Sequence, residues 1–310
     1  MRVQFNTILC ATDFSDFSNH TVGYGVALAK EFGARLIICH VIDLSSVAIY
    51  GEFQLDPVGQ QNRIMEDANV QLEALAGDQP VAWEPLISVG KPADEISRAV
   101  EEQNIDLVIT ATRGRSGFKR LILGSVTERL MRTLTCPLLV VRSPENEFVT
   151  PAEQKFQLKK ILVGCDFSPD SGRAFDHGLS LAQEFQAELH LAHVIEPPVQ
   201  PNLLIEETFV SGEIHEDYNN QLIQKLKNMV PGEAANWCTP QTSIMEGQPY
   251  DELVKYADTR DIDMIVLGVR GHGLVKTLFL GSTTDRVIRN SPCPVLSVSL
   301  KVQNEPEKIS

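Results

Sequence analysis

The 310-residue chain has no apolar run near the roughly 20 residues that a membrane-spanning helix needs. Its first residues, MRVQFNTILCATD, also lack the arrangement of a secretory signal, because Asp13 arrives before any apolar region of useful length. The sequence therefore predicts a cytoplasmic protein with no membrane partner.

The chain also has few basic residues relative to acidic ones. Lys and Arg number 27 against 41 Asp and Glu, which leaves a net charge of −14. A surface with this balance repels nucleic acids and anionic lipids. We expect no nucleic-acid partner, and the acidity by itself identifies no ligand.

Cysteine and histidine form no metal-site pattern. The six cysteines include no CxxC pair, and the seven histidines include no HxxxH or HExxH. We interpret the cysteines as small buried apolar side chains in a reducing compartment. The sequence therefore predicts no metal site.

The chain contains two copies of one unit. ILCATDFSDFS at Ile8 aligns with ILVGCDFSPDS at Ile161, an offset of 153 residues. IDLVITATRG at Ile105 aligns with IDMIVLGVRG at Ile262, an offset of 157. One net insertion of four residues therefore separates the copies, in the middle of the unit, and the repeat predicts two similar domains.

Within each unit, short apolar runs alternate with stretches of helical periodicity. The first copy has the predicted strands ILCAT, RLIICHVI, WEPLISV, LVITAT and PLLVVR, with helices expected at 18–32, 60–75, 93–103 and 125–134. This alternation predicts an open, doubly wound α/β parallel sheet in each copy. The expected divisions are domain one at 1–144, a linker at 145–157, domain two at 158–302 and a disordered tail at 303–310.

Glycines recur with a fixed spacing after the fourth predicted strand. In the second copy Gly268, Gly271, Gly281 and Ser282 give G-x2-G-x9-G-S, which is neither GxxxxGK[ST] nor GxGxxG. Glycine lets a backbone approach a ligand closely. The helix expected at Ser282 offers unpaired amides and a positive dipole end. The pattern predicts a polyphosphate site at the carboxyl edge of the sheet, and Arg270 adds positive charge.

Together with a strand-ending aspartate and a second strand that ends in His-Val, this spacing resembles the universal stress protein family along both halves of the chain. The resemblance implies two tandem five-stranded domains of the Rossmann-like, adenine nucleotide alpha hydrolase-like type, with strand order 3-2-1-4-5. It also implies a stress-response protein that binds ATP, with or without Mg²⁺. In the family the last strand mediates dimer formation, so an intrachain pseudo-dimer is expected. Whether whole chains also form a homodimer is a question that the sequence does not decide.

The resemblance further implies a nucleotide site in each half. In the second half the residues are Asp166 and Val194 at the adenine, Gly268 and Gly271 at the ribose and inner phosphates, and Gly281, Ser282 and Thr283 at the outer phosphates, with Arg270 nearby. In the first half the matching residues are Asp13, Val41, Ala111, Gly114, Gly124, Ser125 and Val126. Because Ala111 replaces the first glycine, the second half is expected to bind best and the first to bind weakly or to serve as a scaffold.

Some of these residues have a structural alternative. Asp13 and Asp166 each precede a helix and suit a cap or a turn. Ser125 and Ser282 each begin a capping-box sequence. Arg270 either clamps phosphate or is solvated.

The predicted phosphate loop is not accompanied by a convincing catalytic set. We therefore expect a sensor or regulator with unknown protein partners rather than a turnover enzyme. Two alternatives stay open. One is a slow ATPase or phosphotransferase in which Ser282 binds Mg²⁺ or accepts a phosphoryl group. The other is a protein-interaction module that no longer binds nucleotide.

Overall fold

The computed structural model describes residues 3–44, 57–77, 79–112, 123–142, 149–150, 155–156, 158–196, 212–270 and 281–299. The first half contains β1 (Thr7–Ala11), α1 (Asp16–Phe32), β2 (Arg35–Ile42), α3 (Pro57–Ala76), β3 (Trp83–Val89), α4 (Pro92–Glu102), β4 (Leu107–Ala111), α5 (Ser125–Thr133) and β5 (Leu138–Val141). The second half contains β8 (Lys160–Gly164), α6 (Pro169–Phe185), β9 (Glu188–Ile195), α7 (Gly212–Met229), the 3₁₀ helix η3 (Gly232–Asn236), β10 (Thr239–Glu246), α8 (Pro249–Thr259), β11 (Met264–Gly268), α9 (Ser282–Asn290) and β12 (Val295–Val298).

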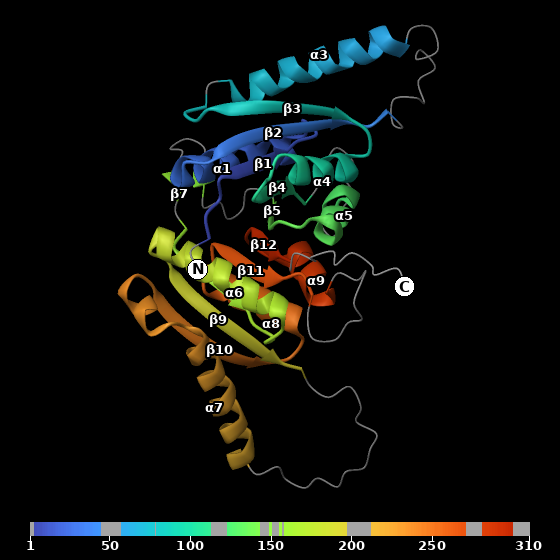
Figure 1. Cartoon of the computed structure of the whole chain (residues 1–310). Helices are drawn as coiled ribbons and strands as arrows, with labels where there is room; N and C mark the ends of the chain where they lie inside the picture. Colours follow the sequence, from blue (N-terminus) through green and yellow to red (C-terminus); the bar gives the residue numbers. More distant parts are fainter. Residues whose placement is uncertain are drawn as a thin grey trace, which may run out of the picture.

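These ten strands form one sheet in the order β10-β9-β8-β11-β12-β5-β4-β1-β2-β3. Within each half the neighbouring strands are parallel and follow the order 3-2-1-4-5. The predicted pair of doubly wound domains is therefore confirmed. Figure 1 shows the two halves one above the other, the first in blue to green and the second in yellow to red.

The halves join where β5 and β12 pair as antiparallel strands. Leu139 lies opposite Leu296, and Val140 lies opposite Val295. All residues of both strands are buried. An apolar strand of this kind would otherwise be an exposed sheet edge that seeks a partner. The two copies supply that partner to each other, which confirms the expected intrachain pseudo-dimer.

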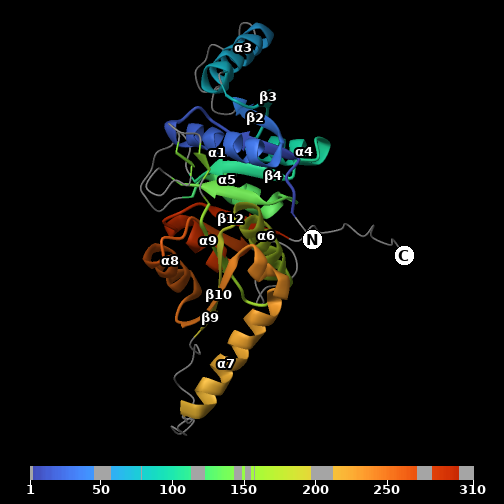
Figure 2. The same cartoon turned by 90° about the vertical axis from the view of Figure 1, so that its left-hand side faces the viewer.

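Helices cover both faces of the sheet. On one face α1, α3, α6 and α7 contribute to one hydrophobic cluster, and on the other face α4, α5, α8 and α9 contribute to a second. The first cluster crosses from one half to the other, where the rings of Phe32 and Phe185 have centroids 6.1 Å apart. Figures 1 and 2 place α3 and α7 at opposite ends of the molecule.

The segment expected to be a linker contains β6 (Val149–Thr150) and β7 (Lys155–Phe156), which pair as antiparallel strands. The expected tail at 303–310 lies outside the described residues. In the part of the chain that the structure describes, no helix combines the length and the apolar character needed to cross a bilayer.

Candidate functional site

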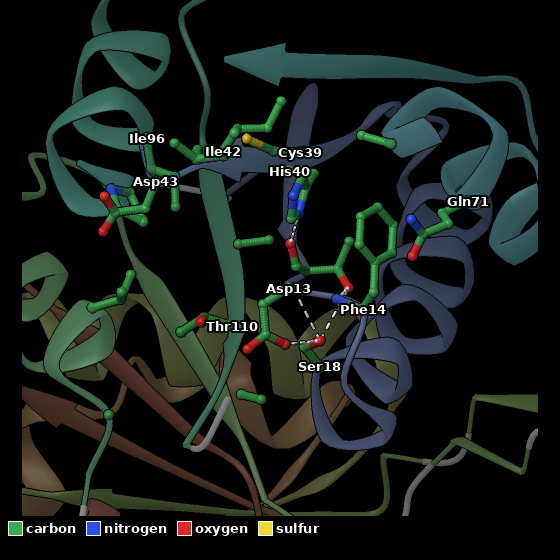
Figure 3. Close-up of a pocket in the computed structure, with 18 of the residues that line it drawn as sticks. Asp13, Phe14, Ser18, Cys39, His40, Ile42, Asp43, Gln71, Ile96 and Thr110 are labelled. Carbon is green, nitrogen blue, oxygen red and sulfur yellow. Dashed lines mark hydrogen bonds between the residues drawn. The ribbon is translucent and has the colours of Figure 1, made fainter. Parts of the chain in front are cut away.

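The sheet has a switch point in the first half, between β1 and β4. These strands are neighbours, yet α1, which follows β1, and α5, which follows β4, contribute to the clusters on opposite faces. Such a reversal opens a crevice beyond the carboxyl ends of the strands. A cavity of about 490 Å³ lies there, lined by residues from the ends of β1, β2 and β4, from α3, and from the starts of α4 and α5 (Figure 3).

This cavity brings together most of the residues that the sequence predicts for the first half. Six of the seven line it: Asp13, Val41, Ala111, Gly124, Ser125 and Val126. The seventh, Gly114, lies outside the described residues. Ala111 therefore lines an open cavity, and its methyl group does not close it.

The turn between β1 and α1 is held in a strained conformation at the cavity wall. Asp13 Oδ1 accepts hydrogen bonds from the Ser15 amide (3.1 Å), the Ser15 hydroxyl (2.6 Å) and the Ser18 hydroxyl (2.7 Å). Ser15, not Asp13, is the N-cap of α1, so Asp13 is a turn residue. Phe14 has φ of 63°, and its counterpart Phe167 has the same value. Such strain costs about 1–3 kcal/mol and is typical of functional sites.

His40 supports this turn from β2. Its Nδ1 donates a 2.9 Å hydrogen bond to the carbonyl oxygen of Thr12, and its ring lies 4.3 Å from that of Phe14, centroid to centroid. The second half repeats the arrangement, with His193 bonded to the Cys165 carbonyl oxygen at 2.7 Å. Because a carbonyl oxygen only accepts, Nδ1 carries a proton in both rings. The contacts give these histidines a positioning role.

Helix α3 supplies a wall of the cavity that sequence analysis did not assign. Ile64 and Ala68 present apolar side chains there, and Asp67 and Gln71 present polar ones. In Figure 3, Gln71 lies on the side of Phe14, and Asp43 and Ile96 lie beyond His40. The helical periodicity of 60–75 predicted the helix, but periodicity alone does not show which of its residues face a ligand.

The start of α5 closes the other end of the cavity. Gly124 is the N-cap, without a side-chain capping bond, and Ser125 is the first helical residue. The second half has the same arrangement at Gly281 and Ser282. The capping-box interpretation of both serines is therefore wrong, because each serine lies one position inside the helix. The first-turn amides of an α-helix have no intrahelical acceptor, which suits an anion.

The residues predicted for the second half occupy the matching edge of that sheet. Asp166 follows β8, Val194 lies on β9, Gly268 ends β11 with Arg270 two residues further on, and Gly281, Ser282 and Thr283 begin α9. Gly271 lies outside the described residues. Asp166 Oδ1 accepts a 2.9 Å hydrogen bond from the Ser168 amide, so Asp166 too is a turn residue, and Ser168 caps α6.

Packing between α6 and β11 gives a reason for glycine at position 268 that needs no ligand. A Cβ atom at this position would lie 2.7 Å from the carbonyl carbon of Asp170 and 2.8 Å from the amide nitrogen of Ser171. Both atoms belong to the backbone of α6. Glycine is therefore required for close packing of α6 on β11, and its retention no longer argues for a ligand.

The cysteine thiols beside the two candidate sites are not activated. Burial raises the pKa of Cys39, which lines the cavity, to about 12, and the charge of Glu95 adds to the effect. Burial likewise raises the pKa of Cys165 to about 12, with Asp166 adding to it. Both thiols stay protonated at neutral pH and are poor nucleophiles. No group of three or more His, Cys, Asp or Glu residues suited to a metal ion occurs within the described ranges.

Comparison with known proteins gives consistent matches. The model of the Universal stress protein family matches residues 4–142 and again residues 157–299. Universal stress protein MJ0531 of Methanocaldococcus jannaschii is 32% identical over 142 residues, covering 45% of this chain and 81% of that protein. Universal stress protein Slr1230 of Synechocystis sp. is 23% identical over 316 residues, covering 94% of this chain and 99% of that protein.

A solved structure shares the fold over almost the whole length. The crystal structure of a universal stress protein from Archaeoglobus fulgidus matches with a TM-score of 0.69 at 24% identity. The match covers 96% of this chain and 99% of that one. The tandem architecture is thus common to both proteins.

Proposed function

Because the chain belongs to the universal stress protein family, we propose that it binds an adenine nucleotide, ATP, in the cavity of its first half and acts as a regulator. The observation that carries the proposal is the cavity at the β1–β4 switch point, which ends at the first turn of α5. Its volume of about 490 Å³ lies in the range of small-molecule and cofactor sites.

The cavity offers suitable groups for each part of the nucleotide. Asp13 and the backbone of Val41, at the ends of β1 and β2, would contact the adenine and its surroundings. The apolar side chains of Ile64, Ala68 and Ile96 line the same cavity and suit a flat base. Gly124, Ser125 and Val126 at the start of α5 would hold the outer phosphates through backbone amides.

Carboxylates in the cavity are suited to contact the nucleoside part of ATP rather than its phosphates. Asp13, Asp43 and Asp67 all line it, and the lining residues that the structure describes include no Lys or Arg. Carboxylates accept hydrogen bonds from ribose hydroxyls and from the amino group of adenine. The phosphates would instead depend on the amides and dipole of α5. The basic residues that the sequence adds at 113–120 lie outside the described residues.

Isothermal titration with ATP, on protein freed of co-purified nucleotide, tests the proposal. We expect saturable binding that is lost in Gly124→Phe, because this residue lines the cavity. The backbone should tolerate the change, since a Cβ at Gly124 meets its nearest atom, the Thr112 carbonyl oxygen, at 3.4 Å. Gly232→Phe is the matched control, because a Cβ there has no neighbour within 4 Å.

Absence of ATP binding by the wild-type protein would contradict the proposal, and so would unchanged binding by a folded Gly124→Phe variant. Titration in the presence of EDTA shows whether Mg²⁺ contributes. Phosphate release measured with the same two proteins tests turnover. A regulator should release phosphate no faster than Gly124→Phe.

A further inference from the structure

The two copies have different side chains near a pair of equivalent aromatic rings, Phe14 and Phe167. In the first half Gln71 precedes the buried Leu72 on α3, and it lines the cavity together with Phe14. In the second half the residue that precedes the buried Leu226 on α7 is Lys225. A neutral amide in one copy therefore corresponds to a cation in the other.

Lys225 uses that position to cover an aromatic face. Its Nζ lies 3.8 Å from the ring centroid of Phe167, the counterpart of Phe14. Phe167 also packs against His193, with ring centroids 4.8 Å apart. An ammonium group over a ring is attracted by the ring's negative face. A nucleotide base that stacked on this face would have to displace Lys225.

A carboxylate binds the backbone that follows β11. Asp170 is 3% exposed, and its Oδ2 accepts a 3.1 Å hydrogen bond from the amide of Arg270. Ser168 donates a 3.4 Å hydrogen bond to the carbonyl oxygen of the same residue. Arg270 lies within the glycine-containing segment predicted to meet the phosphates. The Arg270 amide, which belongs to this segment, is therefore already bonded to a carboxylate of the protein itself.

At the helix position that matches Asp170, the first half has no carboxylate. Its residue at the same helix position is Phe17, two places after the capping Ser15 just as Asp170 is two places after the capping Ser168. The close approach that brings Asp170 to Arg270 depends on Gly268, where a side chain would clash with the α6 backbone. Phosphate near Asp170 would also meet a like charge at low solvent exposure, where repulsion is strong.

We propose that the second half is a self-occupied nucleotide site, in which Lys225 and Asp170 hold the groups that a nucleotide would need. The inference rests on the proposed function, and it concerns how many nucleotides one chain binds. The wild-type chain binds one ATP, in the first half. Replacing Lys225 by Gln and Asp170 by Asn removes the ammonium group from Phe167 and the negative charge beside Arg270, and so opens the second half to ATP.

The experiment separates the two halves by closing the first one. Isothermal titration with ATP is carried out on the full-length chain as Gly124→Phe and as Gly124→Phe combined with Lys225→Gln and Asp170→Asn. Gly124→Phe should show no measurable binding. The triple variant should bind ATP at least about tenfold more tightly than the detection limit that applies to Gly124→Phe. This corresponds to a change of about 1.4 kcal/mol in binding free energy. Gly124→Phe with Lys225→Gln alone should give part of this gain, and this surface substitution avoids the risk of disturbing the buried Asp170.

Matched controls test whether a change in net charge alone could produce the gain in ATP binding. Lys227→Gln changes the same charge at an exposed position on α7, and Asp176→Asn does so at an exposed position on α6. In the Gly124→Phe background these substitutions should leave ATP binding absent. Thermal unfolding of each variant confirms that it is folded.

Three results overturn the inference. Gly124→Phe alone could bind ATP as tightly as the triple variant, the folded triple variant could fail to bind, or Lys225→Gln could weaken an existing site. The first of these results also contradicts the placement of ATP in the first half, whereas the other two concern the inference alone. Failure of nucleotide binding as such looks different. In that case the wild-type chain binds no ATP, whatever the triple variant does.

Discussion

Thr127 donates a 2.8 Å hydrogen bond from its buried hydroxyl to the carbonyl oxygen of Ala111. Thr284 makes the same 2.8 Å bond to Gly268 in the second copy. The bond ties the first turn of α5 to the end of β4, and so fixes the helix start that closes the cavity. The position of the proposed phosphate site thus depends on a cavity-lining threonine whose hydroxyl is bonded to the protein's own backbone.

Replacement of Thr127 by Val should therefore affect both stability and binding. The buried Ala111 carbonyl loses this donor, which lowers the free energy of unfolding by about 1–3 kcal/mol. ATP affinity should fall, because the start of α5 is no longer fixed. Denaturant unfolding and titration calorimetry measure the two effects. Thr284→Val is the control: a similar loss of stability with unchanged ATP affinity is expected, and equal effects of both variants on affinity would contradict the assignment to the first half.

Gly268→Ala should destabilise the protein by packing alone. Its Cβ would lie 2.7 Å from the backbone of Asp170, which can move only by shifting α6. We expect a loss of about 1–3 kcal/mol in the free energy of unfolding, typical of overpacking. Ala111→Gly, the reverse change in the other copy, should cost about 0.5–1 kcal/mol through backbone entropy. Denaturant unfolding distinguishes them, and an unaffected Gly268→Ala variant would show that α6 does not pack this closely.

Stability should decrease in mild acid because of His190. Burial lowers the pKa of this histidine, and the Glu188 carboxylate, whose Oε2 lies 3.4 Å from Nε2, offsets only part of the effect. A folded-state pKa below the unfolded value of about 6.5 means that proton uptake favours unfolding. The contribution is fully present above about pH 6.5 and is lost as the pH falls through the lowered pKa.

The matching variant is His190→Ile, since the corresponding position in β2 is Ile37. Tyr256, which bonds to His190 Nδ1 at 3.0 Å, keeps Ser243 as a hydrogen-bonding partner at 3.2 Å. Unfolding free energies from pH 8 to pH 5.5 should fall less steeply in the variant. His177, whose pKa is also lowered by burial, leaves a residual slope in both proteins. Identical slopes would exclude His190 as the source.

Residues 1–144 alone should form a dimer. In the full chain the apolar strand β5 pairs with β12, and removal of the second half exposes that edge. Sedimentation velocity of the folded fragment should show twice the monomer mass at micromolar concentrations. A folded fragment that stays monomeric would mean that β5 does not drive association.

Fold prediction from the sequence succeeded because the signal was present twice. Two aligned copies fixed the positions of the strands, and the continuous apolar character of runs such as LVITA matched the complete burial of β4. The pairing of the two halves followed from the apolar last strand of each copy, which needs a partner, and from the family resemblance; its antiparallel direction was not predicted. Local patterns and repeats were sufficient for the strands and the two copies, and the resemblance supplied the strand order.

The site was harder to predict because glycine shows only that a side chain is missing. Gly268 leaves space for the backbone of α6, and Gly124 lines a cavity, yet both occur in the same sequence pattern. The sequence also could not show that Lys225 covers Phe167, because that contact joins residues far apart in the chain. A cavity is present in the half where alanine replaces the first of the three glycines, so the retention of glycine does not by itself predict which half contains one.

The antiparallel pairing of β5 with β12 places the carboxyl end of one strand beside the start of the other. The carboxyl edges of the two parallel half-sheets are therefore separated along the seam, and each is built from its own copy. In a homodimer of identical subunits, every mutation alters both sites at once. Here the copies share one polypeptide but not one set of codons, so one edge can change its chemistry while the other is preserved, and the joint between them stays intact.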